Sequence, residues 1–315
     1  MIRTRGLSHS FKSRQGPVKA VDGVDLTVEA GEIFGFLGPN GAGKTTTLRM
    51  LVTLLPPTGG EATVAGCDLR RQPRQVRERI GYVGQSGGTH PAMSGRGELI
   101  CQGRLYRMSK QEAIQRAAEL LRIVELEDAA DRPTSTYSGG MRRRLDVALG
   151  MVHRPQVLFL DEPTTGLDPQ SRSHLWREVG RLRSEGVTVF LTTHYLEEAD
   201  ALCDRLAIID HGQIVAEGTP EELKQEVAGD VVVLGIKGDH QPALQLLQSQ
   251  PFVREVNFEN EALRLYVDQG ESSLPVILRL LDGAHIELRT ISLSRPSLDD
   301  VFLRQTGHSL REEAA

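Results

Sequence analysis

The fold of this 315-residue chain is decided by residues 32–45, which read EIFGFLGPNGAGKT. The apolar run 33–37 predicts a strand buried on both faces, and residues 44–55, stopped by Pro56 and Pro57, predict a helix. Between them, Gly38 to Thr45 match the pattern G-x-x-x-x-G-K-[ST] in full. Glycines let the backbone wrap closely around an anion, and the helix N-terminus faces it. The stretch therefore predicts a loop that binds the phosphates of a nucleotide.

The loop residues divide the expected contacts among them. Lys44 can reach the β- and γ-phosphates, Thr45 can ligate Mg²⁺, and Thr46 can add a hydroxyl near the α- and β-phosphates. The residues expected to bind nucleotide in this loop are Gly38, Pro39, Asn40, Gly41, Ala42, Gly43, Lys44, Thr45 and Thr46.

A second apolar run, residues 157–160, ends in Asp161 and Glu162. Such a run predicts a buried strand whose carboxyl end opens beside the phosphate loop, where open α/β sheets bind ligands. Asp161 is expected to hold Mg²⁺. Glu162, one residue beyond the strand, is expected to accept a proton from an attacking water.

Strands alternate with helices along most of the chain, which predicts an α/β fold with a largely parallel sheet covered on both faces. Residues 171–184 predict a helix with Leu175, Val179 and Leu182 inward. Residues 109–124 predict an amphipathic helix that starts with a capping box at Ser109 and Glu112. Its apolar face is expected to contain Ile114, Ala118 and Leu121.

The tail differs from the rest of the chain. From Glu226 onward it has 8 basic and 14 acidic residues, against 37 and 42 in the whole chain. Its apolar segments between 231 and 291 follow the order β-α-β-β-α-β of a small ferredoxin-like module, and 297–304 predict a last helix. We therefore expect two domains, 1–225 and 226–315.

Composition excludes several classes of protein. The net charge of −5 disfavours a general nucleic-acid binder, because phosphate backbones need a basic surface. The N-terminus lacks the apolar core of a signal peptide, and no stretch approaches the roughly 18 apolar residues of a membrane helix. Cys67, Cys101 and Cys203 are scattered, which is typical of reduced thiols in a cytosolic protein.

Residues 137–141, YSGGM, resemble the LSGGQ signature of ABC-type ATPases, and further family motifs follow in order. Residues 166–169, GLDP, resemble the D-loop, and 191–194, LTTH, end in the position of the switch histidine. Phe11 lies 27 residues before Gly38, where the family places an aromatic ring that stacks on adenine. The resemblance covers residues 1 to about 223. It adds as site residues Phe11, Gln85, Ser138, Gly139, Gly140, Asp168 and His194.

The resemblance implies a mechanism that uses ATP and Mg²⁺. Two such domains pair head to tail, so that Ser138 and Gly140 contact the γ-phosphate held by the partner's phosphate loop. Glu162 would polarise the water, His194 would contact the γ-phosphate, and Asp168 would link the two sites. Gln85 would touch Mg²⁺ and the water, and a helical subdomain at about 86–150 would dock on a membrane protein.

Within the family the chain resembles the ATP-binding subunits of daunorubicin-resistance type exporters. The stretches that carry this likeness are 137–146, 195–200, 209–212, 216–223 and 296–303. Departures are Tyr137 and Met141 in the signature, the run SGGTHP at 86–91, and GRGEL at 95–99, where relatives usually read T-x-E-N-L. Arg142 to Arg144 are expected to form a solvated basic helix face, and His90, His153 and His174 to have no catalytic role.

We therefore expect an ATPase subunit that powers efflux of a drug, antibiotic or lipid-like substrate. It would work through a separate transmembrane permease, as a homodimer or with a paired ATPase subunit, at the cytoplasmic face of the membrane and without nucleic acid.

The alternative is a soluble ABC ATPase with a role in translation or repair. The ribosomal class needs two cassettes, whereas the loop occurs once here. The chromosome and repair class needs a long coiled coil between loop and signature, whereas Thr45 and Tyr137 are only 92 positions apart. A regulatory domain with inactive sites is disfavoured because Lys44 and Glu162 are intact. An importer ATPase is disfavoured because the tail resembles that of export subunits.

Overall fold

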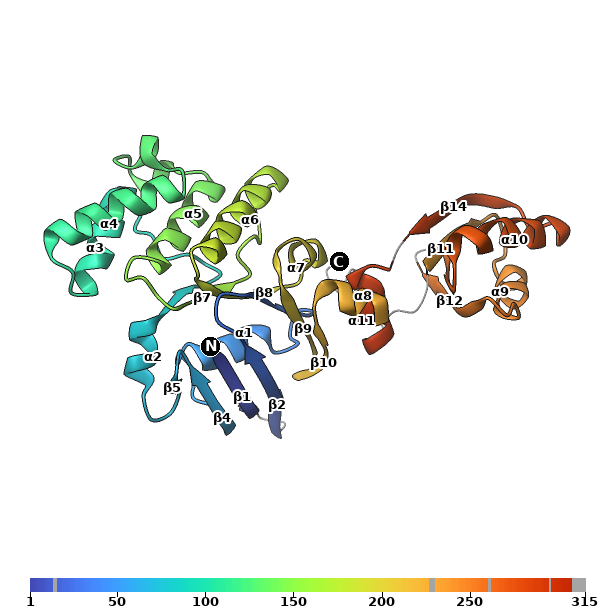
Figure 1. Ribbon diagram of the computed structural model, residues 1–315, viewed down its shortest axis with the longest axis horizontal. Coiled ribbons are helices and arrows are strands. Elements are labelled where there is room, and N and C mark those ends of the chain that lie inside the picture. Colours follow the sequence, from blue (N-terminus) through green and yellow to red (C-terminus); the bar gives the residue numbers. More distant parts are fainter. Residues whose placement is uncertain (14–15, 227–229, 260–261, 295, 308–315) are drawn as a thin grey trace. The chain divides into compact units, whose positions relative to one another are not determined.

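A computed structural model of the chain describes residues 1–13, 16–226, 230–259, 262–294 and 296–307 (Figure 1). The chain divides into two compact units, Met1–Pro220 and the described residues that follow from Glu221. The division falls inside helix α8 (Pro220–Glu226). Each unit is described by itself.

The centre of the first unit is a six-stranded sheet in the order β10-β9-β3-β8-β7-β6. All neighbouring strands in it run parallel except β10, which is antiparallel to β9 at one edge. Every residue of β3, β7 and β8 is buried, as expected for parallel strands covered on both faces. The strands are β3 (Ile33–Leu37), β6 (Ile80–Val83), β7 (Val157–Asp161), β8 (Thr188–Thr193), β9 (Arg205–Asp210) and β10 (Gln213–Gly218).

A separate antiparallel sheet holds the N-terminal strands, in the order β2-β1-β4-β5. It consists of β1 (Ile2–Ser13), β2 (Gly16–Val28), β4 (Gly59–Val64) and β5 (Cys67–Asp68). Burial alternates in the second half of β4, where Ala62 and Val64 are buried and Glu61 and Thr63 are exposed. The sequence predicts strands at 7–12, 20–27 and 63–65, but neither the two-residue β5 nor the grouping of these strands into a sheet of their own.

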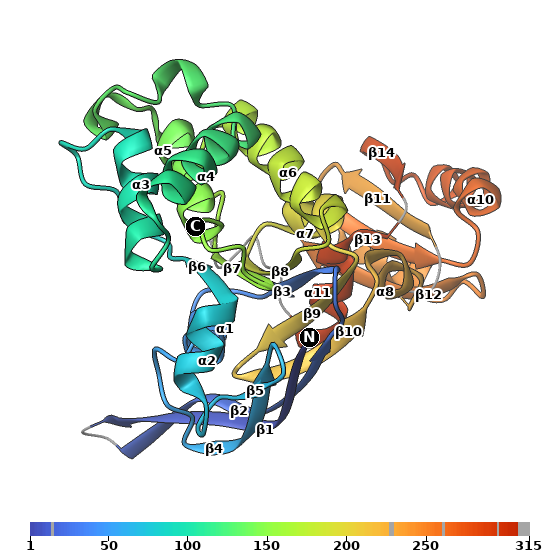
Figure 2. The ribbon, with the colours of Figure 1, turned by 60° about the vertical axis from the view of Figure 1, so that its left-hand side comes forward.

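Three helices form a subdomain within the first unit, and Figures 1 and 2 show it apart from the antiparallel sheet. They are α3 (Gly95–Leu105), α4 (Lys110–Ile123) and α5 (Gly139–Gly150), with short 3₁₀ turns at Glu127–Ala129 and Thr134–Thr136. The capping box at Ser109 and Glu112 is confirmed. The remaining helices of this unit are α1 (Lys44–Leu51), α2 (Pro73–Arg79), α6 (Pro169–Ser184) and α7 (Leu196–Leu202).

Two expectations about helices were wrong. Helix α1 ends at Leu51, four residues before the expected end. The apolar face of α4 was placed only partly correctly: Leu121 is buried as expected, but Ile114 is 42 % exposed and Ala118 is exposed, whereas Ala113 and Ala117 are buried. The reason is the close approach of α3 to α4: a Cβ at Gly103 would lie 3.0 Å from the Cβ of Ala113, so only small residues fit between the helices. By contrast, Leu175, Val179 and Leu182 are buried in α6 as predicted.

The second unit contains the six elements of the tail in the expected order, followed by one more helix. Its antiparallel sheet has the order β12-β13-β11-β14, and a buried cluster that includes Val232, Leu265 and Ile277 forms its core. The elements are β11 (Asp230–Ile236), α9 (Gln241–Gln248), β12 (Val253–Glu259), β13 (Ala262–Val267), α10 (Gly270–Gly283), β14 (Leu288–Ser294) and α11 (Leu298–Thr306).

Candidate functional site

The phosphate loop joins β3 to α1, and its shape depends on glycine. Gly41 and Gly43 have φ angles of 84° and 106°, in the left-handed region that favours glycine. A Cβ on Gly38 or Gly43 would lie 2.3 Å or 2.4 Å from a backbone carbonyl oxygen, that of Ile209 or Ala20. The loop therefore has a conformation that residues with side chains could not adopt without moving their neighbours.

Lys44 lies at the start of α1 and is almost completely buried. Its Nζ donates hydrogen bonds to the carbonyl oxygens of Gly38 at 2.7 Å and Pro39 at 2.9 Å, and lies 3.5 Å from Glu162 Oε1. The ammonium group is thus held inside the loop, where an anion bound by the backbone would meet it.

Oxygen atoms from three elements meet at Asp161, the last residue of β7. Asp161 Oδ1 accepts hydrogen bonds from Thr45 Oγ1 at 3.2 Å and Thr192 Oγ1 at 2.7 Å. Hydroxyl and carboxylate oxygens are the ligands that Mg²⁺ prefers, so this group fits that ion.

Glu162 follows directly, with a φ of 45°, a strained value for a residue with a side chain. Its backbone N–H is anchored by Thr192, through the hydroxyl at 3.0 Å and the carbonyl at 3.1 Å. Its carboxylate accepts hydrogen bonds from Gln85 Nε2 at 3.1 Å and Thr165 Oγ1 at 3.2 Å, and lies 3.4 Å from His194 Nδ1. The loop, the acidic strand end, Gln85 and His194 therefore meet at one place.

The electrostatics of this place favour an ionised Glu162. The pKa of its carboxyl is lowered to about 2, first by the His194 imidazole and then by the Lys44 ammonium, against the opposing effect of burial. At neutral pH the side chain is a carboxylate, able to accept a proton or to orient water.

The signature residues lie at the N-terminus of α5. Ser138 is the N-cap, its Oγ accepting from the N–H of Met141 at 3.2 Å, and Ser138 and Gly139 are exposed. Asp168 is the exposed N-cap of α6: its carboxylate accepts from Ser171 N–H at 3.0 Å and Ser171 Oγ at 2.6 Å, which lowers its pKa. A Cβ on Gly140 would lie 2.6 Å from Ser171 Oγ, so the two helix starts pack closely.

Phe11 lies near the end of β1, opposite Val18 of β2, and is 45 % exposed. Its ring meets that of His9 edge to face, with 4.5 Å between centroids. It therefore does not belong to the core and leaves part of its ring free for stacking.

Three residues at the site were missed from the sequence: Thr192, Thr165 and Arg143. Thr192 is the last but one residue of β8, a wholly buried strand, and the change there from apolar residues to two threonines was a usable signal. The expectation that Arg142 to Arg144 form a solvated face was wrong, because Arg143 is 7 % exposed and Arg144 is half-buried. Arg143 shares the spacing i, i+3, i+4, i+7 with buried Asp146, Val147 and Gly150, and this helical period places it inward.

Arg144 belongs to a junction between α4, α5 and α6. It donates to the carbonyl oxygens of Val124 at 2.9 Å and Glu125 at 3.2 Å, beyond the end of α4.

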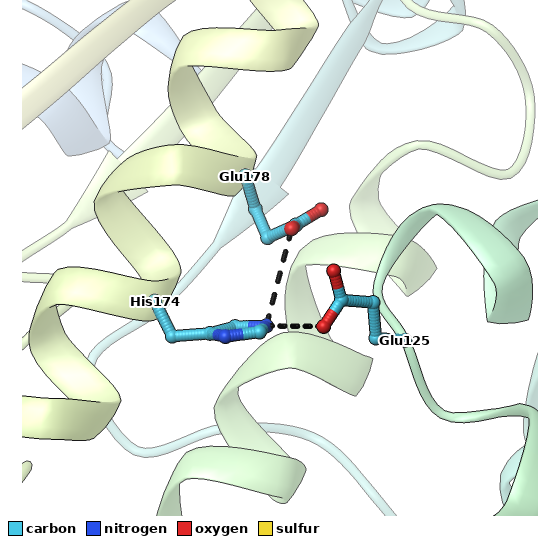
Figure 3. A group of neighbouring side chains, drawn as sticks. All are labelled: Glu125, His174 and Glu178. Atoms are coloured by element: carbon cyan, nitrogen blue, oxygen red, sulfur yellow. Dashed lines mark ion pairs between the residues drawn. The ribbon is translucent and has the colours of Figure 1, made fainter.

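Figure 3 shows the nearby Glu125, His174 and Glu178, with His174 Nε2 3.4 Å from Glu125 Oε2 and 3.9 Å from Glu178 Oε1. Two of the three are carboxylates, a donor set that a metal ion could use. However, Arg144 and Arg177 contact the His174 ring at 3.1 Å and 3.0 Å, and Arg181 pairs with Glu178 at 3.0 Å. We read the group as an ion-pair junction, because guanidinium groups already balance its acids.

Two departures from the family pattern contact each other. The hydroxyl of Tyr137, which replaces leucine, donates to the carbonyl of Ala129 at 2.7 Å and is buried. A Cβ at residue 95 would lie 2.5 Å from that hydroxyl oxygen, so Gly95 provides the space that Tyr137 uses.

A cavity of about 620 Å³ lies beside Gln85, between the loop that follows β6 and the helical subdomain. Glu98 of α3 and Tyr106, just after that helix, line the cavity. Asp146 of α5 and His153, which follows α5, also line it. The cavity thus joins the loop that contacts Glu162 to the subdomain.

The comparisons with known proteins agree with this geometry. Residues 21–165 match the family model "ABC transporter", and residues 218–306 match "ATP-binding protein DrrA1-3-like, C-terminal domain". The daunorubicin resistance ATP-binding protein DrrA2 of Streptomyces coeruleorubidus is 46 % identical over 96 % of this chain and 94 % of its own. The Nod factor export ATP-binding protein I of Burkholderia lata is 40 % identical over 96 % of this chain and 97 % of its own.

Solved structures of ATP-binding proteins resemble about 70 % of the chain. A dimeric ATP-binding cassette in a post-hydrolysis state, bound to ADP and phosphate, aligns with a TM-score of 0.64 at 25 % identity, over 70 % of this chain and 98 % of that one. The cbiO1 protein of Clostridium perfringens aligns with a TM-score of 0.66 at 27 % identity, over 71 % and 90 % of the two chains. Among the helices that the structure describes, none has the length and apolarity to cross a membrane.

Proposed function

The chain belongs to the ATP-binding proteins of the ABC transporter family, and from this membership we propose how its residues bind and hydrolyse ATP to drive export. It is the ATP-hydrolysing subunit of an ABC exporter, and relatives that match it over nearly its full length are named as a daunorubicin resistance and a Nod factor export ATP-binding protein. The observation that carries the residue assignments is the convergence of Lys44, Asp161, Gln85 and His194 around Glu162.

ATP binds with its phosphates in the loop from Gly38 to Thr46. The backbone N–H groups and the N-terminus of α1 receive the negative charge, and Lys44 neutralises the β- and γ-phosphates. The exposed ring of Phe11 stacks on the adenine. The carbonyl-bound position of Lys44 Nζ supports this role, since the ammonium group is already oriented into the loop.

Thr45 and Asp161 would hold Mg²⁺, with Gln85 as a third ligand. When bound, the ion neutralises charge that develops on the transferred phosphoryl group. The hydroxyl of Thr192 orients the Asp161 carboxylate by donating a 2.7 Å hydrogen bond to its Oδ1.

Glu162 is the general base. Its low pKa keeps it ionised, so it can orient a water toward the γ-phosphate and accept its proton. His194 contacts the γ-phosphate and, through its position beside Glu162, responds when that phosphate leaves. The anchored N–H of Glu162 supports this assignment, because a base must be held within about an ångström of its working position.

Two chains act together. Ser138, Gly139 and Gly140 are exposed or half-exposed at the start of α5, where the helix dipole favours an anion, so they are suited to the γ-phosphate held by a partner cassette. Asp168 links the two sites across the same surface. The dimeric cassette among the structural relatives supports this arrangement.

The exporter is completed by a separate membrane permease. We place its docking surface at the cavity beside Gln85, since this loop touches both Glu162 and the helical subdomain. The chain thereby works at the cytoplasmic face of the membrane. Relatives named for daunorubicin, doxorubicin and linearmycin resistance support a drug-like or antibiotic cargo.

The test is a Glu162→Gln variant that is expressed in its native cells and purified from their membranes. It is expected to bind ATP, to form an ATP-dependent dimer in size-exclusion chromatography and to lose turnover about 10²- to 10⁴-fold, because its general base is absent. A permease should co-purify with this dimer. Hydrolysis near the wild-type rate would refute the assignment of the base.

A further inference from the structure

Arg143 is a buried charge whose donors all face the catalytic backbone. It lies in the second turn of α5, five residues after Ser138, and is 7 % exposed. Its Nε donates to the carbonyl of Pro163 at 2.7 Å, its Nη1 to Gly84 at 2.6 Å and its Nη2 to Asp161 at 3.0 Å. Each of the three guanidinium nitrogens therefore holds a different backbone carbonyl.

These carbonyls surround the general base. Asp161 and Pro163 are the residues directly before and after Glu162, and Gly84 directly precedes Gln85, which itself donates to Glu162. Glu162 has the strained φ of 45°, and such a conformation persists only where its surroundings hold it. The Arg143 guanidinium fixes both neighbours of the strained residue, while Thr192 fixes its N–H.

Burying a guanidinium group is unfavourable unless it is well hydrogen-bonded. Burial lowers the pKa of Arg143, although the nearby Asp146 and Asp161 oppose this effect. A planar fork with several donors can bind carbonyls in three directions at once, whereas a lysine offers a single point charge. The geometry is thus specific to arginine.

We propose that Arg143 is a positioning residue that fixes the general base of one ATP site to the signature helix that serves the other. This inference rests on the proposed function: in a head-to-tail dimer, Glu162 acts on the ATP of its own phosphate loop, while Ser138 of the same chain contacts the partner's ATP. Arg143 connects the two through one helix, so a shift of the signature helix displaces the base.

The first experiment compares Arg143→Met with Arg143→Lys and with the matched control Arg142→Met, whose arginine is exposed on the same helix. In Arg143→Met we expect kcat to fall about 100-fold with ATP affinity within about twofold, since a displacement of 1 Å can cost that much. Arg143→Lys should restore about tenfold of this loss, and Arg142→Met should match the wild type. Circular dichroism and denaturant unfolding verify that each variant is folded.

Three results would overturn the proposal. One is a folded Arg143→Met protein whose kcat is within twofold of the wild type. Another is an equal loss of kcat and ATP affinity, which would indicate a general collapse of the site. The third is a failure of both Arg143→Met and Arg143→Lys to fold, which would make Arg143 a residue of the fold alone.

The link between sites is tested with two mixed dimers, each limited to one working site by Lys44→Ala. In the first dimer, Arg143→Met is in the chain with the intact loop, which supplies Glu162 to the working site. In the second dimer, Arg143→Met is in the Lys44→Ala chain, which supplies the signature helix to that site. We expect slower turnover in both; an unaffected second dimer would overturn the link to the signature helix. The proposed function itself fails if the wild-type protein does not hydrolyse ATP, or if Glu162→Gln hydrolyses it equally well.

Discussion

Replacing Glu162 by glutamine should make the protein less sensitive to acid. In the native state the pKa of this carboxyl is lowered to about 2, whereas its ordinary value is 4.5. A group whose native pKa is depressed stabilises the fold above its unfolded pKa, and this contribution disappears as the pH falls toward the native pKa. The relevant window for Glu162 is therefore pH 4.5 to 2.

The size of the effect follows from the shift. A pKa lowered from 4.5 to about 2 corresponds to about 3 kcal/mol of stability at neutral pH. By the same linkage, about 1 kcal/mol of this is lost at pH 4 and about 2 kcal/mol at pH 3. The variant has no carboxyl at this position, so its stability should fall less between pH 6 and pH 3 by about that 2 kcal/mol.

The assay is urea unfolding of wild type and Glu162→Gln at pH 6, 4 and 3, followed by circular dichroism. The other titrating groups are present in both proteins, so the difference between the two pH profiles reports Glu162 together with the groups coupled to it, His194 and Lys44. A matched control is Glu61→Gln, which changes an exposed acid of β4. Parallel profiles for wild type and Glu162→Gln would refute the conclusion that His194 and Lys44 hold the carboxylate in its charged form.

Lys44→Ala should weaken ATP binding about 10- to 100-fold in calorimetry, because charged hydrogen bonds to the phosphates are lost; unchanged affinity would contradict its role. Thr192→Val removes the buried hydroxyl that serves both Asp161 and the N–H of Glu162, and should lower the free energy of unfolding by about 1–3 kcal/mol. Tyr137→Phe should cost about 1 kcal/mol by removing the phenol donor of the Ala129 carbonyl, which keeps its hydrogen bond from the N–H of Arg132 at 3.0 Å, with ATP affinity unchanged. A loss of ATP affinity in Tyr137→Phe would show that its hydroxyl serves the site as well as the fold.

Local patterns predicted the parts of the site that follow one another in the chain. The phosphate loop needs a strand before it and a helix after it, and residues 33–37 and 44–51 form them. The acidic strand end was equally readable, because β7 is buried throughout and changes abruptly to Asp161 and Glu162. Both signals are carried by residues that are adjacent in sequence.

The missed features depend on contacts between distant segments. Arg143 was mistaken for a surface residue because its carbonyl partners belong to β7 and to the loops after β6 and β7, 18 to 59 positions away. The inward side of α4 was misjudged because Gly103, on another helix, sets how closely α3 approaches. The separate sheet of β1, β2, β4 and β5 was missed because the alternation of apolar and polar residues predicts a strand but not the strands with which it pairs.

The contact between Tyr137 and Gly95 limits how cassettes of this family can recombine. A crossover that brings in a side chain at residue 95 but keeps Tyr137 would force a Cβ to within 2.5 Å of the phenol oxygen. The opposite crossover, which brings leucine to residue 137, would leave the Ala129 carbonyl without the phenol as donor. Chimaeras with their junction between residues 95 and 137 should therefore express poorly, whereas those that exchange the whole segment should fold.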